Sequence, residues 1–484
     1  MLNRKLLEII GLWDKKEQKD FQTFLASPYF NKGVQAPILI QFYSLILKHE
    51  ANLEHPRLSK EAVTKHLFGV ASPDKKSLHQ LDKLGTGLLD LTEQYLAQKE
   101  YEARQSPAKK LLATMKFFRK HQQDQRFWQA KEAAFKALES SSWRDSWYFF
   151  DAFELHGEVT NMSTPIASLK KDLGIDLADQ AIDKFFVATK LEIAITQQFQ
   201  AQNFNATHQY TSLLKAIRDW VVAKAETRPA IIELQMEILN MFETPPSIEE
   251  ALALEQKISQ NKVLFPYELA QFLYTCSRSI ITRAGGHTHE SLDIRMAIFQ
   301  ISKRHLEEGF LLFDGKISTN TLRILLSISL SIGNTTWAKK LLEDFPPGRL
   351  MGTKYPKEFC QLNWAYYYFF LKDYENAEKH LQFSNFENPL FGLFADVQLI
   401  KIYYETNNEL LDARMKALDQ KIRRSTQTES WKLQISNFLK FLEKLVRLQG
   451  FKEPAVHTSL LETIETTPAV YHKDWLLEKL SALP

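Results

Sequence analysis

The chain has 484 residues, of which 44% are hydrophobic and 25% are charged, a composition typical of a globular protein rather than a disordered one. The net charge of +3 is nearly balanced, which argues against a dedicated nucleic-acid coat. Two cysteines, Cys276 and Cys360, are too few for a disulfide framework or a four-thiolate zinc site and favour a reducing compartment.

Targeting and membrane segments are not expected. Residues 1–13 carry Glu8 inside their apolar part and lack a small-residue cleavage site, so we expect no signal peptide. The most membrane-like stretch, residues 324–338, is too short to span a bilayer and includes polar side chains. We therefore expect a cytoplasmic protein that contains no membrane segment.

The periodicity of apolar residues is helical along the whole chain, with no convincing alternating strand. Glycine is scarce, at 16 residues, which favours helices joined by short turns. Prolines fall between the periodic segments, where helix ends tolerate them. Asp14 with Glu17, and Ser247 with Glu250, have the spacing of a capping box. The sequence thus predicts an all-α fold.

The first hundred residues have a pattern of their own. Their predicted helices lie at residues 14–26, 36–49, 59–68 and 73–99. The rest of the chain has the pattern of successive helix pairs. We place the boundary near residue 102, which gives an N-terminal helical domain at 1–102 and a helical-repeat region at 103–484.

The most unusual charge pattern is the stretch 103–123, which contains no acidic residue. Its basic residues are Arg104, Lys109, Lys110, Lys116, Arg119 and Lys120. With the neighbouring aromatics Phe117 and Phe118, such a helix could follow a phosphate backbone and stack bases. Most charge runs of this kind are solvated helix faces, with the apolar residues turned inward. We favour the solvated face and keep nucleic-acid association as the alternative.

A repeat unit is clearest at residues 359–389. Its defining residues are Trp364, Ala365 and Tyr368 on the first helix, the turn Lys372-Asp373-Tyr374, Ala377, Leu381 and Ser384 on the second helix, and the closing Pro389. This pattern of small and bulky positions resembles the tetratricopeptide repeat. Weaker neighbours at 325–345 and 402–417 extend the resemblance over about residues 318–423.

The resemblance implies an α-α superhelix, a tetratricopeptide-like solenoid, because helix pairs bury their apolar faces by stacking on one another. Two further stretches, Ser-Pro-Tyr-Phe-Asn at 27–31 and Trp-Leu-Leu-Glu-Lys at 475–479, resemble an uncharacterised family of helical bacterial proteins of the kind found in Bacteroidetes. That second resemblance implies no activity and supports only the helical interpretation.

In tetratricopeptide-like repeats the first helix of each pair lines the concave face of the superhelix. By this resemblance the partner-binding candidates are Asn320, Arg323, Leu362, Asn363, Tyr366, Phe369 and Phe370. Arg323 and Asn320 could grip a carboxylate or a backbone amide. The alternative for the aromatic residues is a place in the core, where buried aromatics dominate.

Motifs for catalysis, cofactors and metals are absent or weak. No G-x-x-x-x-G-K-[ST], G-x-G-x-x-G or G-x-S-x-G motif occurs, and Gly85-Thr86-Gly87 has no strand before it. The tightest metal-like cluster is His287, His289 and Glu290, which is also the pattern of a turn before a helix. We expect no cofactor, no bound metal and no enzymatic activity.

A protein–protein interaction scaffold is the function we expect. It would bind a peptide or a partner helix in the concave groove of the helical repeats, through preformed side-chain pockets. A nucleic-acid-associated protein that uses the stretch 103–123 is the alternative, and an enzyme with an unrecognised site ranks third.

Overall fold

A computed structural model describes most of the chain, namely residues 2–33, 35–52, 54–162, 174–204, 207–208, 213–224, 228–284, 292–382, 386–424, 429–448 and 454–483. These residues form 23 α-helices and three very short strands. The fold is therefore almost entirely helical, as the sequence predicts. Within the described ranges, none of the helices combines the length and the apolarity that a membrane-spanning segment requires.

Most contacts fall within two compact units. Unit 1 contains residues 1–141 and 150–182, and unit 2 contains residues 142–149 and 183–484. The helices of unit 1 are α1 (Arg4–Gly11), α2 (Lys15–Ala26), α3 (Ala36–Lys48), α4 (Lys60–Phe68), α5 (Lys75–Ala103), α6 (Pro107–Lys120), α7 (Asp124–Glu139) and most of α8 (Ser146–Thr160), with a 3-10 turn at Pro56–Leu58.

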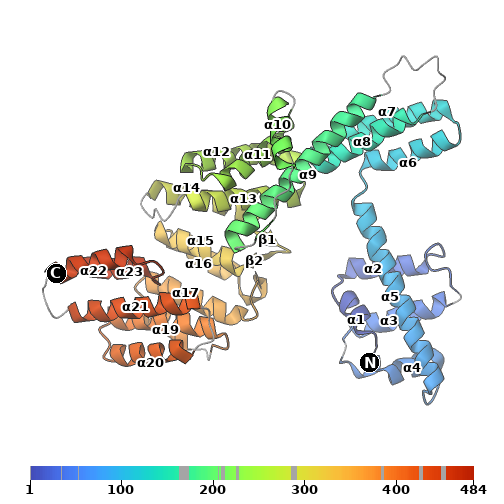
Figure 1. Ribbon diagram of the computed structural model, residues 1–484. Helices are drawn as coiled ribbons and strands as arrows, with labels where there is room; N and C mark the ends of the chain where they lie inside the picture. The colour runs from blue at the N-terminus through green and yellow to red at the C-terminus, as the bar shows by residue number, and fades with distance from the viewer. Residues whose placement is uncertain are drawn as a thin grey trace. The chain divides into compact units, whose positions relative to one another are not determined.

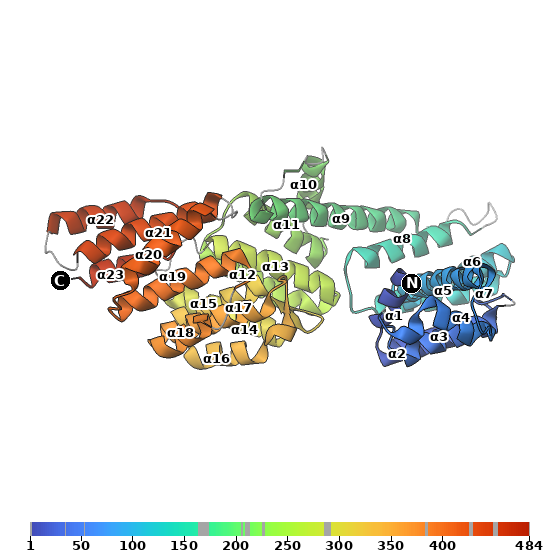
Figure 2. The same ribbon diagram turned by 90° about the horizontal axis from the view of Figure 1, so that it is seen from below.

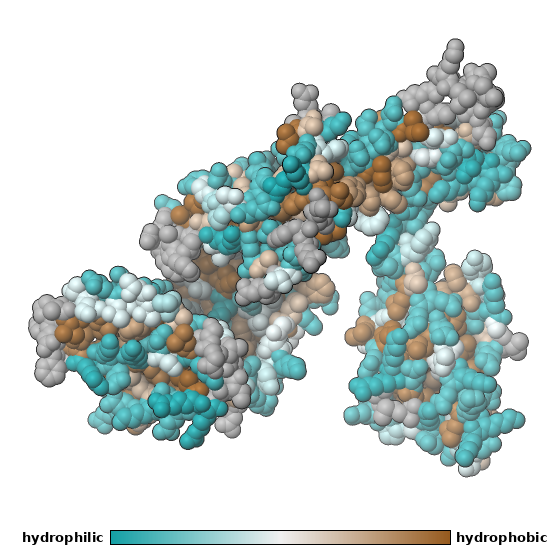
Figure 3. All heavy atoms as spheres, viewed as in Figure 1, coloured by the Kyte–Doolittle hydropathy of each residue, from teal (hydrophilic) through white to brown (hydrophobic). Residues whose placement is uncertain are grey.

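In unit 1, helices α1 to α4 pack along the long helix α5 (Figure 1). Phe21 is fully buried at the centre of this core, where its ring contacts those of Trp13, Tyr43 and Tyr95. Helix α2 begins where the sequence predicts, because the Asp14 side chain accepts a hydrogen bond from the third residue of the helix. Exposed apolar side chains are scattered singly over these helices, as is normal for a protein surface (Figure 3).

The predicted boundary at residue 102 coincides with the last turn of α5, and the core formed by residues 2–95 lies before it. Compact unit 1 nevertheless extends further and includes α6 and α7, which the prediction assigns to the repeat region. The physical reason is that α6 packs closely against α7 and forms ion pairs with the part of α8 that belongs to unit 1.

Unit 2 holds the remaining helices. They are α9 (Ile175–Phe204), whose first turns belong to unit 1, α10 (Leu214–Ala223), α11 (Ala230–Glu243), α12 (Ile248–Asn261), α13 (Tyr267–Ala284), α14 (Leu292–Glu307), α15 (Thr319–Ser331), α16 (Thr335–Asp344), α17 (Pro356–Phe370), α18 (Tyr374–Gln382), α19 (Pro389–Glu405), α20 (Leu411–Arg424), α21 (Glu429–Leu448), α22 (Pro454–Thr466) and α23 (Lys473–Ser481), with 3-10 turns at Lys262–Leu264 and Pro347–Arg349.

From α14 to α21 each helix contacts the next along the chain, and α17 also contacts both α15 and α19 (Figures 1 and 2). Small residues allow this close packing. Ala365 of α17, Ala377 of α18 and Ala395 of α19 are buried in one apolar cluster. Ala365 and Ala377 are the small residues of the predicted repeat unit, whereas Ser384 lies outside the described residues. Pro389 is the first residue of α19 rather than the end of a unit.

Three helix pairs of unit 2 turn in the same way. Gly333, Lys372 and Asn407 have φ angles of 77°, 60° and 47° and follow α15, α17 and α19. The next residue in each case donates its backbone N–H to the carbonyl five residues earlier, at 2.8, 3.0 and 2.9 Å. This is the Schellman motif, which ends a helix and directs the chain into the next one. The pairs α15–α16, α17–α18 and α19–α20 therefore share a local geometry.

A small sheet was not expected from the sequence. Strand β1 (Leu312–Phe313) pairs antiparallel with β2 (Lys316–Ser318), which pairs parallel with β3 (Leu350–Met351). Its signal is the dipeptide Asp314-Gly315, a typical two-residue hairpin turn in which both φ angles are positive. Strand β2 ends at Ser318, whose hydroxyl oxygen accepts a hydrogen bond from the backbone N–H of Thr321 in the first turn of α15. This cap fixes where the helix begins.

Candidate functional site

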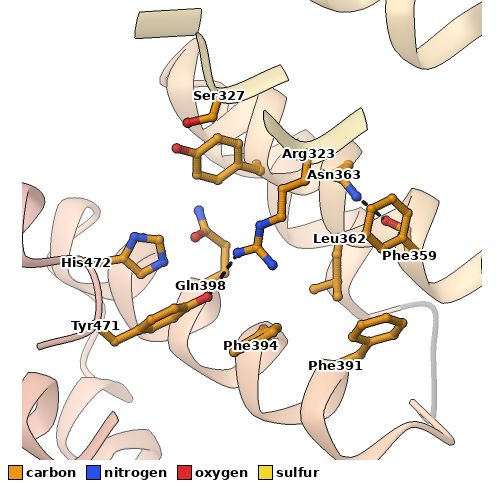
Figure 4. Close-up of a pocket in the computed structure, with 11 residues that line it drawn as sticks. Arg323, Ser327, Phe359, Leu362, Asn363, Phe391, Phe394, Gln398, Tyr471 and His472 are labelled. Carbon is orange, nitrogen blue, oxygen red and sulfur yellow. Dashed lines mark hydrogen bonds between the residues drawn. The ribbon is translucent and has the colours of Figure 1, made fainter. Parts of the chain in front are cut away.

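A pocket in unit 2 opens among α15, α17, α19 and the turn before α23 (Figure 4). Its cavity volume is about 150 Å³, and it is partly open to solvent. The lining residues are Arg323, Ser327, Phe359, Leu362, Asn363, Tyr366, Phe391, Phe394, Gln398, Tyr471 and His472.

Helical periodicity brings these side chains to one face of each helix. Arg323 and Ser327 are four residues apart on α15, and Phe394 and Gln398 are four apart on α19. Residues at this spacing are neighbours on a helix surface. Residues of α15, α17 and α19 all line this one cavity.

Arg323 supplies the positive charge of the pocket. Its guanidinium lies 5.3 Å from the centre of the Phe394 ring and donates one hydrogen bond, at 3.3 Å, to the Tyr471 hydroxyl. Within the described residues no carboxylate forms an ion pair with it, and the side chain is exposed. A guanidinium has five N–H donors, so most of them remain available to a ligand.

Gln398 is a buried amide in the wall of the same pocket. Only 5% of this residue is exposed, and its Nε2 atom has no hydrogen-bond partner among the described residues. Leaving a buried polar group unpaired costs about 1–3 kcal/mol. Asn363 is equally buried, but its amide nitrogen donates to the Phe359 carbonyl oxygen at 2.7 Å. Gln398 is therefore the unsatisfied group of the two (Figure 4).

The turn before α23 closes one side of the pocket. The Tyr471 ring stacks on Phe394 with centroids 5.3 Å apart. His472 has a left-handed backbone with φ of 50°, an uncommon conformation that costs about 1–2 kcal/mol in a residue with a side chain. Burial lowers the pKa of His472 well below its ordinary value, and the charges of Lys401 and Arg323 lower it further. The imidazole is thus neutral at neutral pH.

Both tyrosine hydroxyls of the pocket remain protonated. Burial raises the pKa of Tyr366, and burial likewise raises the pKa of Tyr471. The carboxylate of Asp474 acts on Tyr366 electrostatically but does not line the pocket. None of the lining residues is acidic, and Arg323 supplies the one full positive charge of the lining.

Four predicted partner-binding residues come together in this pocket, namely Arg323, Leu362, Asn363 and Tyr366. The other three do not line it. Asn320 is exposed on the first turn of α15, and Phe370 is exposed at the end of α17. Phe369 is partly buried against the ammonium group of Lys401, 4.3 Å from its ring centre, as the core alternative for the aromatics anticipates.

Sequence reasoning missed Gln398, Tyr471 and His472. Helix α19 is buried on all sides, so its periodicity does not mark the face that carries Gln398. Tyr471 contacts Arg323 across 148 residues of sequence. Local patterns contain no signal for a contact of that range.

Most of the basic stretch lies on α6, and half of its charged groups pair with carboxylates of α8. Lys109 and Lys116 lie 3.4 and 3.6 Å from the two oxygens of Glu154, and Arg119 lies 2.6 Å from Glu158. Glu158 is almost fully buried, so its charge depends on this pair. The three cations therefore hold α6 to α8.

The other basic residues face solvent. Arg104 pairs with Glu100 four residues earlier on α5, and both side chains are exposed. Lys110 and Lys120 are exposed on α6. Only the latter two carry the acid-free surface on which the nucleic-acid alternative depends.

Metal and thiol chemistry has little support in the described residues. Where side chains are described, no three His, Cys, Asp or Glu residues gather closely enough to hold a metal ion. The cluster His287, His289 and Glu290 lies outside the described residues. Cys276 and Cys360 are free thiols, and burial raises the pKa of Cys360 to about 11, which keeps it protonated.

No family of proteins, no curated protein and no solved structure matches this chain. The likeness to the tetratricopeptide repeat therefore stands on the residues and turns described above.

Proposed function

We propose that the chain is a binding protein, a protein–protein interaction scaffold whose α15, α17 and α19 hold a peptide or a partner helix. The observation that carries the proposal is the pocket lined by residues of all three helices. Aromatic anchors and a few polar groups are the usual means of peptide recognition in a preformed groove. The proposal is a binding role rather than a catalytic one.

The proposal includes a tetratricopeptide-like superhelix for the second half of unit 2. Three features support it: the shared turn geometry of the three helix pairs, the contacts of α17 with α15 and α19, and the buried small residues between pairs. Stacked pairs of this kind leave one face of their first helices open to a guest. Two free cysteines agree with a reducing, cytoplasmic location.

Selection of displayed random peptides against the full chain tests the function. We expect selected peptides to bind the wild type and to lose at least about tenfold in affinity for Ser327→Trp. Ser327 is exposed at the pocket, so a large side chain there fills the space without removing core contacts. Tyr366→Ala should also weaken binding, because it removes one wall.

Phe370→Ala is the matched control, since Phe370 is exposed on the same helix but outside the pocket. It should leave the peptide affinity unchanged. Thermal melting of each variant reports whether the fold is kept. The proposal is wrong if no peptide is selected, or if the peptides bind Ser327→Trp as tightly as the wild type.

The alternative, nucleic-acid association through residues 103–123, has less support. Lys109, Lys116 and Arg119 are engaged with α8 and would have to leave their carboxylates to reach phosphates. Retention on single-stranded RNA or DNA that falls steeply between two salt concentrations would revive it.

A further inference from the structure

We propose that the pocket of unit 2 recognises a carboxylate joined directly to an apolar or aromatic body. This inference rests on the proposed binding role and names the chemical group that the pocket takes. The lining offers two donors, the guanidinium of Arg323 and the unpaired amide nitrogen of Gln398. None of the lining side chains is acidic, so no carboxylate of the lining neutralises the guanidinium.

The donors lie close together at one side of the pocket. Figure 4 shows Arg323 and Gln398 pointing toward the same space, with His472 and Tyr471 beside them. The Nε2 atom of Gln398 is buried and has no hydrogen-bond partner among the described residues. A group that accepts from both Arg323 and Gln398 would pair the buried amide nitrogen and the remaining donors of the guanidinium together.

The charge of the pocket favours a single negative charge. Arg323 is the only cation in the lining, and the neighbouring His472 is neutral because it is buried. A phosphate, which carries up to two charges, would bring a second charge that no lining residue compensates. A carboxylate carries one charge and matches the planar fork of a guanidinium.

The opposite side of the pocket is apolar. Phe359, Leu362 and Phe391 lie together there, beyond the guanidinium (Figure 4). These apolar side chains offer no hydrogen bond to a small hydrophilic acid, but an aromatic or aliphatic group can be buried against them. The ligand is therefore amphipathic, with its carboxylate near Gln398 and its body against the rings.

Titration calorimetry with the full chain tests the inference. The probes are 4-phenylbutanoate, its neutral amide 4-phenylbutanamide, and inorganic phosphate. We expect the acid to bind at least about tenfold more tightly than the amide, and phosphate to bind more weakly than the acid. A peptide selected as above, made once with a free C-terminal carboxylate and once amidated, tells whether the carboxylate comes from a peptide end or a free acid.

Three variants assign the effect to residues. Arg323→Gln should remove the preference for the acid over the amide, whereas Arg447→Gln, at an exposed ion pair on α21, should leave it unchanged. Gln398→Leu should weaken acid binding while keeping or raising the melting temperature, because it removes an unpaired buried amide. A merely structural glutamine would show the opposite pair of results.

The outcomes separate this inference from the proposed function. Equal affinities for acid and amide, tighter binding of phosphate, or no acid binding at millimolar concentration would each overturn the carboxylate inference. If selected peptides still bind through the pocket, the scaffold function stands without it. If the free acid binds and no peptide does, the carboxylate inference stands and the peptide function fails.

Discussion

Lys401 is the charged residue that lies deepest in the described part of unit 2. It belongs to α19, only 2% of it is exposed, and its ammonium group lies 4.3 Å from the Phe369 ring centre and 5.3 Å from that of Trp475. Burial lowers the pKa of Lys401 to about 7, although the carboxylates of Glu405 and Glu478 raise it in part. Desolvation thus outweighs these favourable neighbours.

This shift makes the stability of unit 2 depend on pH. The folded pKa of Lys401 lies below its unfolded pKa of 10.5, so between these two values the unfolded state binds more protons than the folded state. Lowering the pH through this range therefore favours the unfolded state. The penalty is absent above pH 10.5, grows as the pH falls toward 7, and is constant below that. We expect Lys401→Met to raise the free energy of unfolding at pH 7 by about 1–4 kcal/mol.

Denaturant unfolding at pH 6, 7 and 9.5 measures the difference. The gain over the wild type should shrink as the pH rises from 7 to 9.5. Lys416→Met, at an exposed position on α20, should have little effect at any pH. A Lys401→Met variant that is less stable than the wild type at pH 7 would show that the aromatic and acidic neighbours outweigh burial.

The sequence predicted only those pocket residues whose position follows from the helix face that they occupy. Arg323, Leu362 and Tyr366 follow from placing first helices along a common groove, which helical spacing and the repeat resemblance allow. Gln398 and His472 do not, because their positions depend on tertiary contacts of α19 and of the turn before α23. By contrast, the Asp314-Gly315 dipeptide is a local signal from which the hairpin of β1 and β2 could have been predicted.

Turns between helices are the elements that the three helix pairs share. Gly333 has φ of 77°, and a Cβ at this position would meet no atom within 4 Å. Any effect of Gly333→Ala therefore comes from the left-handed backbone alone. We expect a loss of about 1 kcal/mol in the stability of unit 2, measured by thermal unfolding.

Gly348→Ala provides the comparison, because Gly348 has equally open surroundings and no positive φ. It should change the melting temperature by much less. A Gly333→Ala variant that melts at the temperature of the wild type would mean that the α15–α16 turn does not need its left-handed residue.

Helix α6 carries basic residues that we interpret as structural, because three of them form ion pairs with α8. Arg119→Met leaves the buried carboxylate of Glu158 without its partner and should destabilise unit 1 by roughly 2 kcal/mol. Lys110→Met, at an exposed position, should cost almost nothing. If α6 instead serves nucleic-acid binding, the two variants should melt alike and both should lower RNA or DNA retention at low salt.

At the scale of the whole chain, the helical class could be predicted from the periodicity of apolar residues, and the repeat stays a prediction. The extent of unit 1 could not be predicted. Helices α6 and α7 form one helix pair, and only their contacts with other helices assign that pair to unit 1. The core of residues 2–95 and the cores of unit 2 share no residue. Two compact units with mostly internal contacts predict two unfolding transitions.

Calorimetry of the full chain should therefore resolve two transitions, and the variants above assign them. Arg119→Met should lower only the transition of unit 1, and Gly333→Ala only that of unit 2. A ligand of the pocket should raise only the transition of unit 2, by about 2.7 kcal/mol at a concentration of one hundred times its Kd. A single transition that every variant and the ligand shift together would contradict the independence of the two units, because a ligand stabilises only the structure that unfolds with its site.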